Sequence, residues 1–196
     1  MHIPALFFIC AFVQRDCIAW FVPNDFGIGI IIPLVKDRTD DLSSVSNYRG
    51  ITLTTVVSKL LECVLLENCM NLLETDELQF AVKKSFSCTH AVFTLRSTVD
   101  YFNSRGSSVF AAALDVSKAF DTFSRRHLFE ALTKAGIPMW IVNVIVNWYS
   151  KLSVAVRWNS TVSHFFNVKA GVRQGGILSP ALFNLFINIY IYILCK

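Results

Sequence analysis

An acidic side chain closes one of the most apolar short segments of the chain. Residues 109–115 form a continuous apolar run that ends at Asp115, and Phe120 and Asp121 follow closely. A carboxylate delivered by a rigid strand can hold Mg²⁺ against a nucleoside triphosphate, because phosphoryl transfer depends mostly on positioning and charge neutralisation. Taken alone, the same pattern also fits a strand-to-helix turn in which the aspartate is only a cap.

A glycine-rich loop is the second candidate for chemistry. Residues 171–184 read GVRQGGILSPALFN, with Gln174 beside Gly175. Glycines let the backbone approach a ligand closely, and the glutamine amide offers both a donor and an acceptor. This loop could seat a base pair or a phosphate, or it could be an ordinary connection between a hairpin and a helix.

Two cations bracket a polar loop near the start of the chain. Lys36 and Arg49 stand on either side of residues 37–48, between two apolar segments. Cations on a hairpin suit a triphosphate, which arginine can grip with two parallel hydrogen bonds. A solvated surface loop is the alternative interpretation.

Hydrophobic periodicity predicts the elements that must position these residues. Helices and strands are mixed without regular alternation, which indicates the α+β class. The strand at 28–36 contains Pro33, which favours the edge of a sheet. The predicted helices are 5–20, 58–73, 89–102, one after the N-cap Ser124, one from Pro138 to Ser150, and one opening at Ser179-Pro180. The predicted strands are 28–36, 109–115 and a hairpin over 154–168.

Composition narrows the class of protein. The chain is 54% hydrophobic and 16% charged, against about 25% charged in an average domain, which favours either a membrane-associated protein or a fragment of a larger one. A net charge of +4 permits nucleic-acid binding without requiring it. Six cysteines occur singly, with no zinc-ligand spacing, and indicate reduced thiols in an intracellular protein of the cytoplasm or nucleus.

The apolar tail at 177–194 is long enough on paper to span a bilayer. It contains Ser179, Pro180, Asn184 and Asn188, which are costly in hydrocarbon, so a membrane-spanning helix is not favoured. No motif implies a protein partner.

Together, three ordered motifs resemble the reverse transcriptases of non-long-terminal-repeat retrotransposons. Residues 31–53 are similar to the fingers signature of that family, I-I-P-x-x-K followed after a gap by N-Y-R-x-I-x-L. Residues 113–121 resemble its first palm motif, and residues 171–184 its next one. The resemblance implies a partial right-hand polymerase fold over residues 1–196, with fingers and adjoining helices to about 108 and an incomplete palm over 109–196.

The resemblance also implies roles for individual residues. Asp115 would be the first catalytic aspartate and a Mg²⁺ ligand, with the Val116 carbonyl as a backbone ligand. Phe120 would be the gate against a 2′-hydroxyl. Lys36 and Arg49 would hold the incoming triphosphate, while Gln174 and Gly175 would lie beneath the incoming nucleotide. The implied partners are an RNA template, a DNA primer and deoxynucleoside triphosphates.

Three departures from the family pattern bear on these roles. Ala81 and Phe86 stand where the family prefers smaller or more flexible residues, and Gly50 replaces a frequent proline. The family also needs two adjacent aspartates on a later hairpin, and the only adjacent pair is Asp40-Asp41 in the polar loop. We therefore expect a chain truncated before the second half of a two-metal site and inactive alone. A non-catalytic nucleic-acid-binding relic and a membrane-associated relic are the alternatives.

Overall fold

The computed structural model describes residues 21–69, 72–73, 79–81, 85–113, 115 and 119–194. The helix predicted at 5–20 and the carbonyl of Val116 lie outside these residues. The helical elements, in chain order, are η1 (Asn24–Gly27), η2 (Val45–Asn47), α2 (Val56–Cys69), α3 (Cys88–Asn103), α4 (Ala119–Thr122), α5 (Arg125–Lys134), α6 (Met139–Ser150) and α7 (Ser179–Leu194). The strands are β1 (Ile28–Val35), β2 (Tyr48–Thr54), β3 (Ser153–Trp158), β4 (Thr161–Val162) and β5 (Phe166–Asn167). The α+β class is confirmed.

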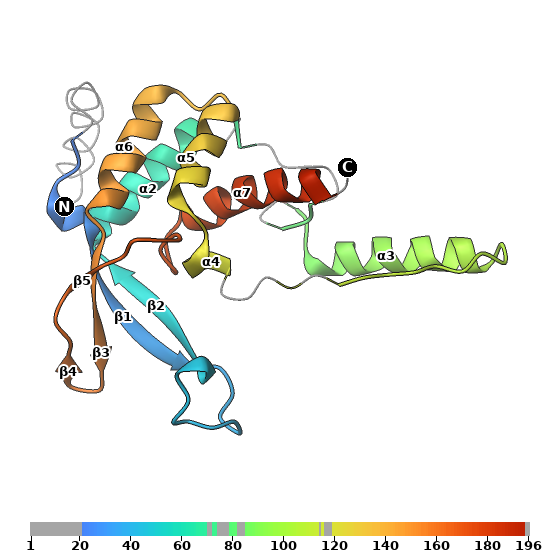
Figure 1. Cartoon of the computed structure of the whole chain (residues 1–196), viewed down its shortest axis with the longest axis horizontal. Helices are drawn as coiled ribbons and strands as arrows, with labels where there is room; N and C mark the ends of the chain where they lie inside the picture. Colours follow the sequence, from blue (N-terminus) through green and yellow to red (C-terminus); the bar gives the residue numbers. More distant parts are fainter. Residues whose placement is uncertain are drawn as a thin grey trace.

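One sheet is built around β1, and the β1–β2 ribbon extends away from the helices (Figure 1). β1 pairs antiparallel with β2 along its length and parallel with β3 over Ile28–Ile31 only. The prediction of an edge strand was therefore wrong for β1 as a whole. Pro33 nevertheless lies beyond the part of β1 that pairs with β3. Its missing N–H therefore removes no hydrogen bond from the β1–β3 ladder.

A layer of four helices, α2, α5, α6 and α7, covers the upper end of the sheet (Figure 1). Trp148 is 1% exposed, and its indole N–H donates to the carbonyl of Phe26 at 2.8 Å, which fixes α6 against η1. Burial of these apolar side chains is the main force that holds the layer together. The fully buried large side chains of the layer include Leu61, Leu65, Leu128, Leu132, Ile141, Ile145, Trp148 and Leu182.

The strand predicted at 109–115 is absent from the described part of that segment. Residues 107–113 adopt no regular structure, and the Phe110 side chain is 96% exposed. A strand is stabilised by hydrogen bonds to a neighbour, and none of the described strands pairs with this segment. The apolar run alone therefore did not determine a strand.

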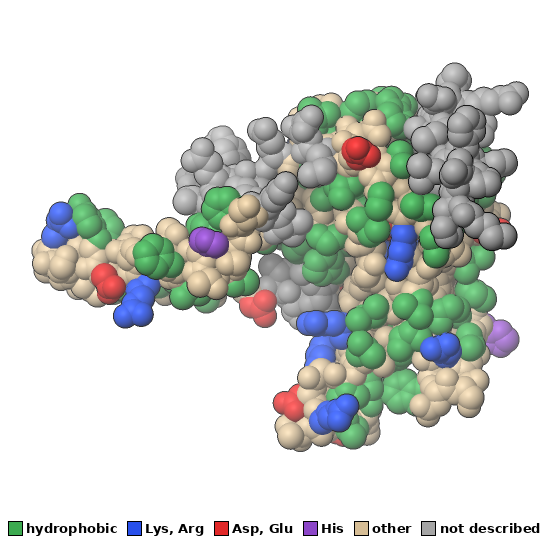
Figure 2. All heavy atoms as spheres, turned by 180° about the vertical axis from the view of Figure 1, so that it is seen from behind, with side chains coloured by type: hydrophobic (Ala, Val, Ile, Leu, Met, Phe, Trp, Pro, Cys, Tyr) green, Lys and Arg blue, Asp and Glu red, His purple; other side chains and the backbone are tan. Residues whose placement is uncertain are grey.

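α3 projects from the body of the molecule (Figure 1), and apolar side chains are visible along it in Figure 2. The prediction of a helix at 89–102 is confirmed, and a capping box between Ser87 and His90 starts it. None of its residues is buried, and Phe93 is 70% exposed. Its amphipathic pattern therefore has no partner surface among the described residues.

The departure at Ala81 is accommodated without a left-handed backbone. Among the described residues near it, Ser85 has a positive φ, of +69°. The carbonyl of Ala81 accepts a hydrogen bond from the Asn184 amide of α7 at 2.9 Å. As for the membrane interpretation, none of the described helices combines the length and apolarity needed to cross a bilayer.

Candidate functional site

The loop over residues 171–178 is fixed in register on α4. The N–H of Gly171 donates to the Phe123 carbonyl at 3.0 Å, and that of Val172 to the Phe120 carbonyl at 2.9 Å. Gly171 has φ +67°, and a Cβ there would lie 2.1 Å from the Phe120 carbonyl oxygen. Only glycine fits this position, because both the backbone angle and the available space exclude a side chain.

The same loop is fixed on β2. The N–H of Thr52 donates to the Gln174 carbonyl at 2.9 Å. Gly175 has φ +92°, and a Cβ on it would lie 3.1 Å from the Thr52 carbonyl oxygen and 3.4 Å from Cγ2 of Ile51. The 174–175 turn therefore lies against β2 beside the Ile51 side chain.

Lys36 and Arg49 share one face of the β1–β2 ribbon. Arg49 pairs in register with Leu34, and the Lys36 N–H donates to the Asn47 carbonyl, which continues the ladder. Cross-strand partners project on the same side, as do residues two apart on one strand. The two cations therefore lie on the face that also carries Ile51, about 7–14 Å along the ribbon from it at about 3.4 Å per residue.

The structure brings together four of the predicted residues. Gln174 and Gly175 lie at the base of the ribbon, and Lys36 and Arg49 lie farther along the same face. Both cationic side chains are exposed, and the Lys36 ammonium donates to the Ser46 carbonyl at 2.7 Å.

Phe120 and Asp115 occupy different environments. The Phe120 ring is half-buried and lies 4.6 Å from the Phe183 ring, so α7 helps to fix its position under the 171–178 loop. Asp115 is exposed and itself belongs to no helix or strand. Among the described residues no group of three or more His, Cys, Asp or Glu side chains could hold a metal ion.

A buried ion pair holds the 171–178 loop, and the sequence interpretation missed it. Glu62 of α2 is 1% exposed and Arg173 is 4% exposed, and their side chains form a short salt bridge. Arg173 also donates to the Ser58 hydroxyl at 2.8 Å and to the Phe26 carbonyl at 3.2 Å. Its guanidinium lies 4.5 Å over the Trp148 ring.

The other oxygen of Glu62 binds the start of α7. It accepts hydrogen bonds from the N–H groups of Ile177 and Leu178, the latter at 3.1 Å. These amides precede the helix that begins at Ser179, where a negative charge is favourable. The signal was present in the sequence, since Glu62 is spaced with Ser58, Leu65 and Cys69 on the buried face of α2.

Arg125 holds the other side of the loop. Its guanidinium is used inside the fold. It donates to the carbonyls of Val168, Tyr149 and Gly171 at 2.6, 2.8 and 3.0 Å. A fourth carbonyl, that of Ala170, accepts from the same guanidinium at 3.4 Å. Burial lowers the pKa of Arg125.

The polar loop at the tip of the ribbon contains its own hydrogen-bonded turns. Thr39 donates to Asp37 and Ser43 donates to Asp41, each through both its hydroxyl and its N–H, and these bonds lower the pKa of both carboxyls. The carboxylates near Lys36 are thus engaged with their own loop.

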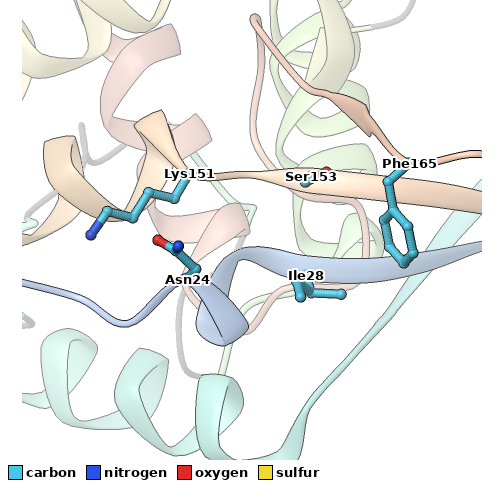
Figure 3. A pocket seen from close by; sticks show the side chains of 5 residues that line it. All are labelled: Asn24, Ile28, Lys151, Ser153 and Phe165. Atoms are coloured by element: carbon cyan, nitrogen blue, oxygen red, sulfur yellow. The ribbon is translucent and has the colours of Figure 1, made fainter.

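A cavity of about 340 Å³ lies at the opposite end of β1 from Lys36 and is lined by Asn24, Ile28, Lys151, Ser153 and Phe165. In Figure 3, Asn24 and Lys151 lie at one end, Phe165 lies at the other, and Ile28 and Ser153 lie between them. The Lys151 ammonium donates to the Val22 carbonyl at 2.6 Å. No acidic side chain lines this cavity, and it is separate from the 171–178 loop.

Comparison with known proteins shows which family the sequence belongs to, independently of the geometry described above. The family described as "Reverse transcriptase (RNA-dependent DNA polymerase)" matches residues 35–194. The chain is 27% identical over 139 residues to the Retrovirus-related Pol polyprotein from type-2 retrotransposable element R2DM of Drosophila melanogaster, covering 71% of this chain and 13% of that protein. It is 27% identical over 174 residues to the Pol polyprotein from type-1 retrotransposable element R2 of Popillia japonica, covering 88% of the chain and 24% of the relative. It is also 27% identical to the probable RNA-directed DNA polymerase from transposon X-element of D. melanogaster, covering 85% of the chain and 18% of the relative. The chain thus spans a quarter or less of the length of these relatives.

Proposed function

The chain belongs to the reverse transcriptase (RNA-dependent DNA polymerase) family, and from that premise we propose that it forms the nucleotide-seating part of the RNA-directed DNA polymerase of a non-long-terminal-repeat retrotransposon. In this proposal residues up to about 108 belong to the fingers and residues 109–196 to the palm. The protein would act inside the cell on an RNA template, a DNA primer and deoxynucleoside triphosphates.

One observation carries the proposal. The turn at Gln174 and Gly175 is fixed against β2 on the face of the ribbon that also presents Lys36 and Arg49. This face offers a close backbone approach at one end and two cations at the other, which suits an elongated ligand with an anionic end. The base and sugar would lie at the 174–175 turn, and the triphosphate would lie toward the cations.

Phe120 would contribute to the choice of sugar. Its ring is fixed by contact with Phe183 and by the hydrogen bond that the Phe120 carbonyl accepts from Val172. A rigid aromatic side chain beneath the 171–178 loop would exclude a 2′-hydroxyl sterically, which is the role that the family resemblance gives it.

The family generally uses Mg²⁺, and Asp115 offers a donor of the type that Mg²⁺ accepts. Two metal ions about 3.5–4 Å apart need more than one carboxylate, and the described residues contain no such cluster. Those residues therefore fit part of a metal site and do not complete it. When bound, Mg²⁺ would neutralise the phosphates and activate the attacking oxygen.

The test is nucleotide binding by the chain of residues 1–196 with an RNA template, a chain-terminated DNA primer and Mg²⁺. The Lys36→Ala/Arg49→Ala variant should bind the matched deoxynucleoside triphosphate at least about tenfold more weakly, because each charged hydrogen bond is worth about 1.5–3 kcal/mol. The control is Arg96→Ala/Lys134→Ala, which removes the same charge from exposed positions on α3 and α5. Equal weakening in the two variants would mean that the ribbon face does not bind the triphosphate.

A second candidate function is nucleic-acid binding without turnover. The five strands of the described chain contain no Asp or Glu, whereas Arg49 and Arg157 are exposed on them. Phe165, just before β5, is 54% exposed and could stack on a base. Salt-dependent binding of an RNA–DNA duplex without any nucleotide binding would favour this candidate over the first.

A further inference from the structure

Asp121 faces the candidate nucleotide site from α4. Both of its carboxylate oxygens accept from the side-chain amide nitrogen of Gln174, each at 2.8 Å. Asp121 is exposed on α4. The structure adds a partner 53 positions away, on the loop that seats the nucleotide in the proposed function.

The chemistry of this contact allows only one orientation of the Gln174 amide. An ionised carboxylate accepts hydrogen bonds and cannot donate them, so the amide nitrogen must face Asp121. The amide oxygen, Oε1, then points away from Asp121 as an acceptor. A neutral partner that both donates and accepts would leave the amide free to rotate by 180°.

The backbone around Gln174 is fixed without Asp121. The Gln174 carbonyl binds the Thr52 N–H, and the preceding residue, Arg173, is held by Glu62. Gly171 attaches the start of the loop to α4. The only part of Gln174 left to be set is the direction of its side-chain amide, and Asp121 contacts that group directly.

We infer that Asp121 is a positioning residue that orients the Gln174 amide, so that Oε1 is presented as an acceptor to an O–H or N–H donor of the incoming nucleotide. This inference rests on the proposed function. The donor is either the sugar 3′-hydroxyl or an amino group of a base, and a nucleotide lacking the hydroxyl distinguishes them.

The experiment measures nucleotide affinity of the 1–196 chain with primer–template and Mg²⁺, for wild type, Asp121→Asn and Asp121→Glu. Asparagine is isosteric but can both donate and accept, so the affinity should fall about tenfold, the loss of one charged hydrogen bond. Glutamate keeps the carboxylate and should restore at least part of the affinity. Asp100→Asn, an exposed aspartate on α3, is the matched control and should bind as wild type does.

Two further readouts separate orientation from a general effect on the fold. Primer–template affinity and the urea midpoint should be unchanged in Asp121→Asn, while the side-chain amide proton resonances of Gln174 should shift. The same affinities are then measured with a 2′,3′-dideoxynucleotide. If wild type and Asp121→Asn now bind it equally, the donor is the 3′-hydroxyl. If the difference in affinity is unchanged, the donor is an amino group of the base.

The outcomes are distinguishable. If wild type binds no nucleotide, the proposed function and this inference are both wrong. If wild type binds and Asp121→Asn binds equally well, Asp121 does not orient Gln174 and the inference alone is overturned.

Discussion

The ion pair between Glu62 and Arg173 gives the sharpest test of how this fold is held together. Their side chains are 2% and 3% exposed, and they join α2, the 171–178 loop and the start of α7. Removing one partner of a buried pair leaves the other charge without compensation, which costs about 3–5 kcal/mol. Because a domain is stable by only about 5–15 kcal/mol, either Arg173→Met or Glu62→Gln should remove a large share of the total.

The double variant should be less destabilised than Arg173→Met alone. Glutamine at position 62 keeps an acceptor for the N–H groups of Ile177 and Leu178. In the double variant the Arg173 guanidinium is gone, so the glutamine amide nitrogen no longer faces a positive charge. We expect Glu62→Gln/Arg173→Met to cost about 1–3 kcal/mol, so that the coupling energy of the cycle is at least about 3 kcal/mol.

The assay is urea unfolding followed by far-ultraviolet circular dichroism, because the Arg173 guanidinium lies over Trp148 and its loss would alter tryptophan fluorescence directly. The control is the exposed pair of Arg126 and Glu130, with side chains 86% and 47% exposed, whose cycle should give no more than about 0.5 kcal/mol. Additive costs for Glu62→Gln and Arg173→Met would refute the reasoning, since they would mean that each charge is stabilised independently of the other.

Two other predictions follow from backbone geometry and from burial. Gly171→Ala should lower the urea midpoint more than Gly106→Ala. Both substitutions place alanine at positive φ, which costs about 1–2 kcal/mol. Only the alanine at position 171 also clashes with the backbone, at a cost of about 1–3 kcal/mol, because nothing lies within 4 Å of a Cβ at Gly106. Equal shifts would contradict the packing of the loop on α4. Burial raises the pKa of the Cys69 thiol to about 11, so iodoacetamide at pH 8 should label exposed Cys63 and Cys88 long before Cys69. Peptide mass mapping checks this, and simultaneous labelling would place Cys69 at an accessible surface.

Local sequence signals predicted much of the fold. Helices at 125–134, 139–150 and 179–194 were expected from apolar periodicity, from Ser124 before the first, and from the prolines at 138 and 180. The hairpin around Asn159 was also expected, and that residue adopts φ +54°, which asparagine tolerates. These features depend on interactions between residues close in sequence, so a short window contains the information.

The strand predicted at 109–115 shows where local reasoning stops. An apolar run of this length is compatible with a strand or with other buried structure, and a strand forms only where another strand supplies hydrogen bonds. None of the described strands does so here, and Phe110 is exposed instead. Asp115 itself belongs to no helix or strand, and its proposed role as a metal ligand is still a prediction.

In the candidate site, too, some features follow from the sequence and others only from the tertiary structure. By itself the sequence determined which residues could do chemistry, because the types and order of Lys36, Arg49, Gln174 and Gly175 form a pattern typical of one family. Only the tertiary structure decided that Glu62 is the buried partner of Arg173 and that Asp121 is the hydrogen-bond partner of Gln174, contacts that span 111 and 53 positions. The physical reason is that a charge is tolerated inside a protein only where the fold brings an opposite charge and hydrogen-bond partners to it, and no local pattern specifies which distant residue will supply them.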